Sequence, residues 1–146
     1  MQYMPIFEGR IRHMKLVEFY TQAVLKELGL GRLRTRPIQI EFGKHAEGAF
    51  GYCNGSKEFA VIRIAKTCPV TKRNLSFLEM MKTLAHELVH AKQFLRGELI
   101  NECGWKWKGR NADGYEYDNQ PWEKEAFRRE EELFAKCFPW HIPFKN

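Results

Sequence analysis

The run His86-Glu87-Leu88-Val89-His90 places two imidazoles and a carboxylate within one short segment. A helix is predicted here, and residues four apart on a helix lie about 40° apart around its axis, on one face. Two histidines in this arrangement suit two ligands of a tetrahedral Zn²⁺. Glu87 lies on the flank of the same face, where its carboxylate can reach a water held at the metal. The motif therefore predicts a zinc site with Glu87 as general base.

Coincidence is a poor explanation of this motif, since the composition predicts roughly 0.02 chance matches to HExxH in the chain. The apolar residues of the predicted helix gather on the side opposite His86: Phe77, Met81, Leu84, Leu88, Ala91 and Leu95. The histidine side carries polar residues: Glu79, Lys82, Thr83 and Gln93. The helix is therefore expected to bury its back and to present the histidines to a polar cleft.

A catalytic zinc keeps three protein ligands, so a third ligand is needed. The last predicted helix has an apolar stripe formed by Ala126, Phe127, Leu133, Phe134 and Cys137. Glu123 and Glu130 fall inside this stripe, whereas Glu125 falls outside it. A buried acid needs a partner, which favours Glu123 as the third ligand; the alternative is that Glu123 only suits the positive end of the helix dipole. Glu125 is the reserve candidate, and His141 in the irregular tail follows it.

Each of the other residues near these candidates has two possible roles. Glu130 either accepts a hydrogen bond from a ligand histidine or pairs with a basic side chain. Tyr115 and Tyr117 either stabilise an oxyanion with a hydroxyl group or simply pack. Trp105 and Trp107 either form a stacking platform for bases or belong to the core, and the core is favoured.

Three helices are predicted to position these residues, at about 17–28, 77–95 and 121–138. The first ends at Gly29, a typical C-terminal stop. Ser76 and Glu79 form a capping box at the start of the second. Pro121 suits the first turn of the third.

Three strands are predicted between the first two helices, at about 38–42, 49–53 and 59–65. Asn54-Gly55 is a strong turn signal, which predicts a hairpin between the second and third strands. Residues 104–117 are expected to form a short aromatic hairpin or an ordered loop. The order predicts an α+β fold in one domain over residues 1–146, with a small three-stranded antiparallel or mixed sheet.

Bulk properties restrict the partners. The net charge of +6 is modest and spread over two basic stretches, Arg32–Arg36 and Lys106–Arg110, so nucleic acid is a secondary possibility. No apolar run approaches the ~18 residues that span a bilayer, and no apolar leader is present, which predicts a cytoplasmic protein without a membrane partner. The cysteines lie far apart in the sequence and are expected to be reduced and buried: Cys53, Cys68, Cys103 and Cys137.

The motif followed by Glu123-x-x-Ala126 resembles the gluzincin metallopeptidases. The resemblance implies that His86, His90 and Glu123 are the zinc ligands and that Glu87 is the base, with an edge strand holding the substrate extended. The small Ala126 would allow the two helices to approach closely. The chain also looks like compact SprT-like or phage-encoded peptidases, but it lacks the third histidine that SprT itself places downstream.

The expected function is that of a zinc-dependent metallopeptidase that hydrolyses peptide bonds in a protein or peptide, with one Zn²⁺ per chain. One alternative is a DNA-associated, SprT-like protease or a nucleic-acid-binding module with a zinc site. Another is a non-catalytic protein with structural zinc. The last is disfavoured because structural sites are usually closed by four ligands and rich in cysteine.

Overall fold

The computed structural model describes residues 4–30, 36–43 and 48–146. Within these residues lie the helices α1 (Met14–Glu27), α2 (Phe77–Leu95) and α3 (Pro121–Cys137). The strands are β1 (Met4–Glu8), β2 (Pro37–Gly43), β3 (Gly51–Gly55), β4 (Ala60–Ala65), β5 (Leu99–Asn101), β6 (Trp105–Trp107) and β7 (Arg110–Asn111), with a 3₁₀ helix η1 (Tyr117–Asn119) before α3. The predicted α+β class is confirmed.

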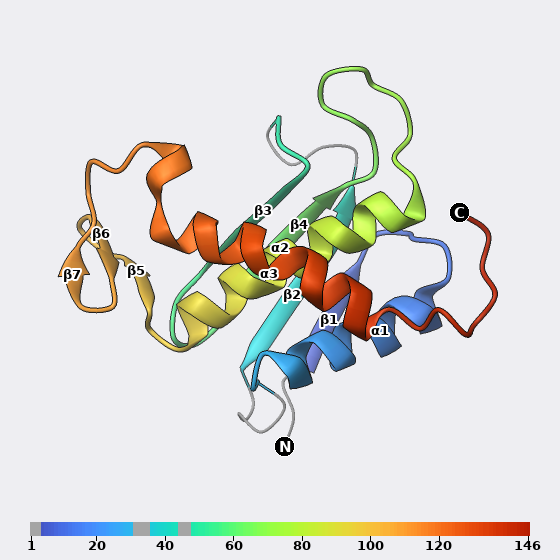
Figure 1. Cartoon of the computed structure of the whole chain (residues 1–146), viewed down its shortest axis with the longest axis horizontal. Coiled ribbons are helices and arrows are strands. Elements are labelled where there is room, and N and C mark those ends of the chain that lie inside the picture. Colours follow the sequence, from blue (N-terminus) through green and yellow to red (C-terminus); the bar gives the residue numbers. More distant parts are fainter. Residues whose placement is uncertain (1–3, 31–35, 44–47) are drawn as a thin grey trace.

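The main sheet has the order β1-β2-β4-β3, so it is one strand larger than predicted (Figure 1). β1 pairs in parallel with β2, β2 pairs in parallel with β4, and β3 pairs antiparallel with β4. The missed strand β1 contains Pro5, which has no N–H to donate to a ladder. Its place at the edge of the sheet tolerates that loss.

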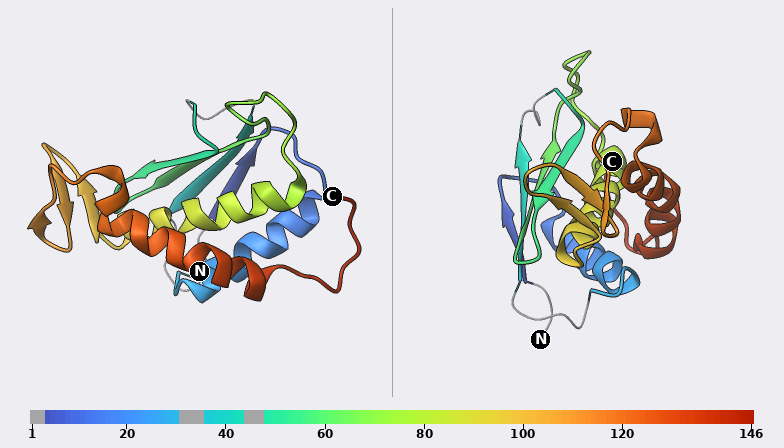
Figure 2. Two further views of the ribbon diagram at one scale, coloured as in Figure 1. Left: turned by 45° about the horizontal axis from the view of Figure 1, so that its top comes forward. Right: turned by 90° about the vertical axis from the view of Figure 1, so that its left-hand side faces the viewer.

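All three helices lie on one face of the main sheet, and α2 runs between the sheet and α3 (Figure 2). Consequently every residue of α2 from Leu84 to Leu95 is buried, including both motif histidines. The histidine side of α2 faces α3 rather than open solvent. Of its polar residues, Lys82 pairs with Glu131 and Gln93 with Glu125 of α3. Thr83 lines a partly polar cavity together with His86, in line with the polar cleft that the sequence predicts.

The start of α2 is held by the predicted capping box. The Ser76 hydroxyl accepts a hydrogen bond from the Glu79 N–H at 3.1 Å, and the Glu79 carboxylate accepts one from the Ser76 N–H at 2.7 Å. The Arg73 guanidinium donates to the same carboxylate at 2.9 Å. These contacts fix the first turn of the helix that carries the motif.

The capping box makes the stability of the fold depend on pH. Mainly the Arg73 guanidinium, helped by the Ser76 N–H, lowers the pKa of Glu79 from 4.5 to about 2. A carboxylate with a lowered pKa stabilises the fold above pH 4.5 and loses that contribution as the pH falls toward 2. Glu79→Gln is therefore expected to lower Tm at pH 6 by more than at pH 3, measured by thermal unfolding. Equal differences at the two pH values would contradict this.

The turn between β3 and β4 lies later than predicted. Asn54 and Gly55 remain in β3, paired with β4, and the turn closes where the Ser56 N–H donates to the Phe59 carbonyl at 2.9 Å. A Cβ at Gly55 would lie 2.5 Å from that carbonyl oxygen. The glycine is therefore needed for close approach of the backbone rather than for the turn itself.

The predicted aromatic hairpin is present as a second sheet with the order β5-β6-β7. The ring of Trp105 stacks on Trp122 of α3 at 5.5 Å, and Trp107 lies 6.0 Å from the same ring. These tryptophans form a small core under the second sheet, as favoured from the sequence. In the described residues no helix has the length and apolar character to cross a membrane.

The two basic stretches and the four cysteines differ in exposure. Of the basic stretch Arg32–Arg36 only Arg36 is described, and its guanidinium donates to the Leu95 carbonyl at 2.9 Å. The stretch Lys106–Arg110 lies on the second sheet, with its basic residues exposed. Cys103 is exposed and Cys53 is only partly buried, contrary to expectation, while none of the four cysteines forms a disulfide.

Candidate metal centre

The motif histidines meet the predicted third ligand between α2 and α3. His86 Nε2 lies 3.0 Å from Glu123 Oε1, and His90 Nε2 lies 3.0 Å from Glu123 Oε2. The potential ligand atoms of the three residues all lie within 4.8 Å of one another. Two atoms bound to one tetrahedral Zn²⁺ lie roughly 3.3 Å apart, so this spacing fits a zinc ion.

The environment of His90 is a second reason to consider a metal here. His90 Nε2 is buried, and within the described residues its contact with Glu123 Oε2 at 3.0 Å lacks the geometry of a hydrogen bond. A buried polar atom without a hydrogen bond is costly unless something else binds it. Two imidazole nitrogens and one carboxylate are also the donor set of a catalytic zinc with an open position.

The other nitrogen of each histidine has its own acceptor. His86 Nδ1 donates to Glu130 Oε1 at 3.1 Å, and His90 Nδ1 donates to Gln93 Oε1 at 2.7 Å. A proton on Nδ1 leaves Nε2 of each ring free to bind a metal. Of the two readings of Glu130 from the sequence, the structure therefore favours the acceptor for a histidine.

Gln93 was missed as part of the site, having been placed only among the polar residues of α2. Its side chain is fully buried, and its amide nitrogen donates to the Trp122 carbonyl at 3.0 Å and to Glu125 Oε1 at 2.8 Å. Because both of these partners are acceptors, the amide oxygen must face His90. The spacing of three residues from His90 on a helix is the signal that could have identified it.

Removal of the Gln93 amide is expected to weaken metal binding while the zinc ligands stay in place. Gln93→Leu leaves His90 Nδ1 without its acceptor, and loss of such a partner typically costs 10–100-fold, so we expect about that loss of zinc affinity. The measurement is a competition titration with a chromophoric chelator. Gln39→Leu on the outer face of β2 is the matched control, and equal affinities in the two variants would contradict the role of Gln93.

Charges in the centre perturb its titratable groups. Burial lowers the pKa of His86, but the carboxylates of Glu123 and Glu130 outweigh burial and raise it to about 10. Burial raises the pKa of Glu123, but both histidines outweigh burial and lower it to about 2. Without a metal, these shifts favour an imidazolium at His86 beside an ionised Glu123, and a divalent cation bound at Nε2 would take the place of that proton.

Glu87 does not join the ligand cluster, as expected for a base. It is only 6% exposed, and it lines a cavity of about 300 Å³ together with His86 and Tyr117. Burial raises the pKa of Glu87 to about 7, against the effect of the two histidines. A carboxyl group that titrates near neutral pH can both accept and return a proton.

Gly51, the first residue of β3, lines this cavity together with the two residues before it. A Cβ on Gly51 would lie 2.9 Å from a carboxylate oxygen of Glu87 and 2.6 Å from the Thr83 methyl group. Glycine therefore lets the edge of the main sheet approach the base closely. The Tyr117 hydroxyl donates to Glu123 Oε1 at 3.3 Å, which places it at the ligand cluster rather than in the core.

Three sequence candidates lie outside the cluster. Glu125 was expected to point to solvent, but its carboxylate accepts hydrogen bonds from Lys92 at 3.2 Å and from Gln93. His141 is exposed in the tail after α3 and is not part of the metal cluster. Tyr115 packs edge-on against Trp122. Phe127, assigned to the buried stripe of α3, is 54% exposed, because its ring lies against His86 instead of the core.

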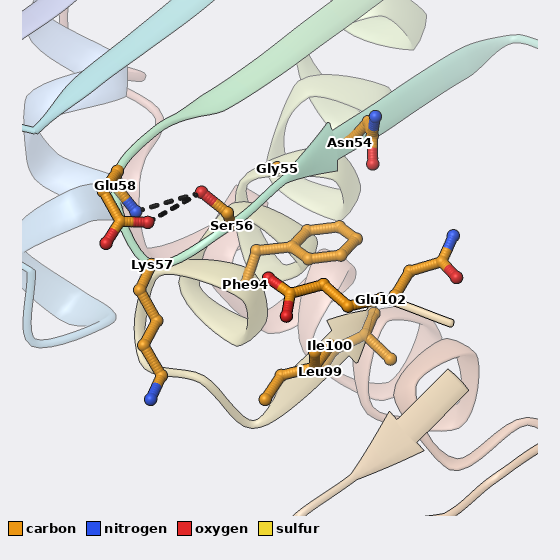
Figure 3. Close-up of a pocket in the computed structure, with 10 residues that line it drawn as sticks. Asn54, Gly55, Ser56, Lys57, Glu58, Phe94, Leu99, Ile100 and Glu102 are labelled. Atoms are coloured by element: carbon orange, nitrogen blue, oxygen red, sulfur yellow. Dashed lines mark hydrogen bonds between the residues drawn. The ribbon is translucent and has the colours of Figure 1, made fainter. Parts of the chain in front are cut away.

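A second cavity of about 320 Å³ lies at the far end of β3 (Figure 3). Its walls are the segment Asn54–Glu58 and the segment Leu99–Glu102, with Phe94 of α2 between them. None of the three candidate metal ligands lines it.

Comparison of the chain with protein-family models gives no match, and comparison with curated proteins gives none either. The site must therefore be interpreted from its own geometry and chemistry.

Proposed function

We propose that the protein is a zinc-dependent metallopeptidase that hydrolyses peptide bonds with Glu87 as general base. The observation that supports this most strongly is the convergence of His86, His90 and Glu123, with a buried carboxyl group at the edge of the same cluster. The three ligands would hold one Zn²⁺ per chain. When bound, zinc would polarise the scissile carbonyl and make a water acidic enough to ionise near neutral pH.

The residues around the metal would divide the remaining tasks. Glu87 would take a proton from the attacking water and pass it to the leaving amine, a role that its raised pKa suits. Burial and the nearby Glu123 raise the pKa of Tyr117 to about 12, so its hydroxyl keeps its proton. That hydroxyl would donate a hydrogen bond to the oxyanion that forms during hydrolysis.

The main sheet offers a place for an extended substrate. β3 is the last strand of the order β1-β2-β4-β3, so one of its edges is unpaired in the described sheet. A peptide that adds to this edge would gain backbone hydrogen bonds and would pass next to Gly51, beside Glu87. We propose a protein or peptide substrate on this basis.

The proposal includes a cytoplasmic location. The cysteines form no disulfides, and Cys68 and Cys137 are buried as free thiols. Free thiols are the usual state in a reducing compartment.

Metal analysis of purified protein, joined to a protease screen, tests this function. We expect about one Zn²⁺ per chain in the parent protein, and its loss in the His86→Ala/His90→Ala double variant. Zinc-loaded protein should cleave an unfolded protein substrate such as casein, and the double variant should not. If no zinc binds on addition, or if zinc-loaded protein cleaves no member of a broad peptide library, the proposed function is wrong.

A further inference from the structure

Two cavities lie along the same strand and the same helix, β3 and α2. Residues of the β3 side line both, with Phe50 and Gly51 at the first cavity and Asn54 and Gly55 at the second. Helix α2 also contributes to both, through Glu87 at the first cavity and Phe94 at the second. The two cavities thus lie toward opposite ends of the edge strand β3.

The distance between the cavities follows from the rise per residue along β3 and along α2. Along β3, four residues separate Gly51 from Gly55, which is roughly 13 Å at the rise of a strand. Along α2, seven residues separate Glu87 from Phe94, which is roughly 10 Å at the rise of a helix. The cavities are therefore separated by about three to four residues of extended peptide. The candidate ligand His86 lines the first cavity, and His90 lies between Glu87 and Phe94 on α2.

The first cavity has an aromatic lining. Phe50 is 48% exposed, Tyr117 is 56% exposed and Phe127 is 54% exposed, and all three line this cavity from different segments. Large apolar side chains that stay exposed around a cavity commonly mark a binding surface. A bulky apolar side chain is the ligand that such a lining fits.

The second cavity combines an apolar floor with an acidic group. Phe94 and Leu99 are buried at its base, and the carboxylate of Glu102 points in toward Phe94 (Figure 3). Within the described residues this carboxylate has no ion pair, whereas Glu58 is held by the Ser56 hydroxyl at 3.1 Å. The amine of Lys57 points away from Glu102 (Figure 3).

This combination suits a long side chain with a cationic end. Lysine and arginine bury an aliphatic stem on apolar surface and keep the charged group at a polar rim. Glu102 would meet that charge, and the pair would form a charge-assisted hydrogen bond. The two cavities therefore select different side chains, one apolar and one basic.

We propose that the edge of β3 binds an extended substrate through two side chains about four residues apart, a bulky apolar one in the first cavity and a lysine or arginine in the second. This inference rests on the proposed function, since the cleaved bond would lie at the first cavity, beside His86 and Glu87. Residues two and four apart in an extended chain point to the same side, so both anchors can face their cavities. Antiparallel pairing with β3, the slightly more stable arrangement, places the basic residue before the apolar one.

The test measures binding of fluorescent peptides to the Glu87→Gln variant by anisotropy. The peptides place Arg before Phe at a separation of about two, four or six residues, and a further peptide has the reversed order. We expect the separation of four with Arg first to bind most tightly, by at least about tenfold. Equal binding of all spacings, or tighter binding of the reversed peptide, would overturn the inference.

Matched variants assign each anchor to its cavity. Phe50→Ala should weaken only peptides that contain Phe, whereas Phe19→Ala on α1, a similarly exposed phenylalanine, should change nothing. Glu102→Gln should weaken only peptides that contain Arg, and this loss should shrink at high salt, whereas Glu18→Gln on α1 should have no effect. If neither Phe50→Ala nor Glu102→Gln changes which peptides bind, the assignment of the anchors to the cavities is wrong.

Failure of the two proposals can be told apart because binding does not require hydrolysis. Spacing-dependent binding with no cleavage by the zinc-loaded parent protein would support this inference and refute the peptidase. Cleavage without any spacing preference would support the peptidase and refute the two-anchor binding of the substrate.

Discussion

In the Glu87→Gln variant, peptide hydrolysis is expected to fall by at least ~10²-fold, the lower end of what a general base contributes. The side chain keeps its size and lies outside the ligand cluster, so zinc binding should survive. An amide cannot accept the proton that the carboxylate takes from water. The measurement is initial velocity on a cleavable peptide, with zinc content determined on the same samples.

The control for this experiment changes Glu125, another acidic residue that contacts α2. Glu125→Gln alters a carboxylate that binds Lys92 and Gln93 but lines neither cavity. Its kcat should therefore change much less than that of Glu87→Gln. Unchanged turnover in Glu87→Gln, with zinc present, would rule out Glu87 as the base.

Local sequence signals were enough to predict the elements that carry the site. The capping box at Ser76 and the proline at Pro121 set the starts of α2 and α3 where they were expected. The apolar stripe of α3 placed Glu123 on the side that faces α2. These features depend on residues near in sequence, and periodicity reports them directly.

Contacts between distant segments explain what was missed. β1 depends on pairing with β2, some thirty residues later, and its own sequence contains a proline that argues against a strand. The burial of α2 from Leu84 to Leu95 results from the packing of α3 across it, which no pattern within α2 reveals. Gln93 likewise gains its role only when Trp122 and Glu125 bind its amide.

The same limit applies to Glu125. A helical wheel measures direction from one axis, and it placed this side chain far from the apolar stripe. In the structure α2 lies on that side of α3, and the Lys92 amine pairs there with the Glu125 carboxylate. Glu123 and Glu125 therefore both face α2, but only Glu123 reaches the histidines.

The choice of Glu123 as third ligand predicts a large change in metal affinity. Glu123→Ala removes a direct ligand, so its cost should exceed the 10–100-fold typical of a supporting residue, and we expect a loss of about 10²-fold or more. The Glu123→Gln variant keeps the size of the side chain but replaces the anion with a neutral amide, so it should also lose affinity. Both are measured by zinc competition titration beside the parent protein.

Two variants on the same helix serve as comparisons. Glu131→Ala removes a carboxylate that is 77% exposed and pairs with Lys82, so zinc affinity should stay unchanged. Glu125→Ala removes one of the two acceptors of the Gln93 amide nitrogen. It should reduce zinc affinity by less than Glu123→Ala does, because the metal ligands themselves remain. If Glu125→Ala releases the metal while Glu123→Ala retains it, the third ligand has been assigned to the wrong carboxylate. If Glu123→Ala, Glu123→Gln and Glu125→Ala all keep parental affinity, neither glutamate is the third ligand, and His141 is the next residue to test.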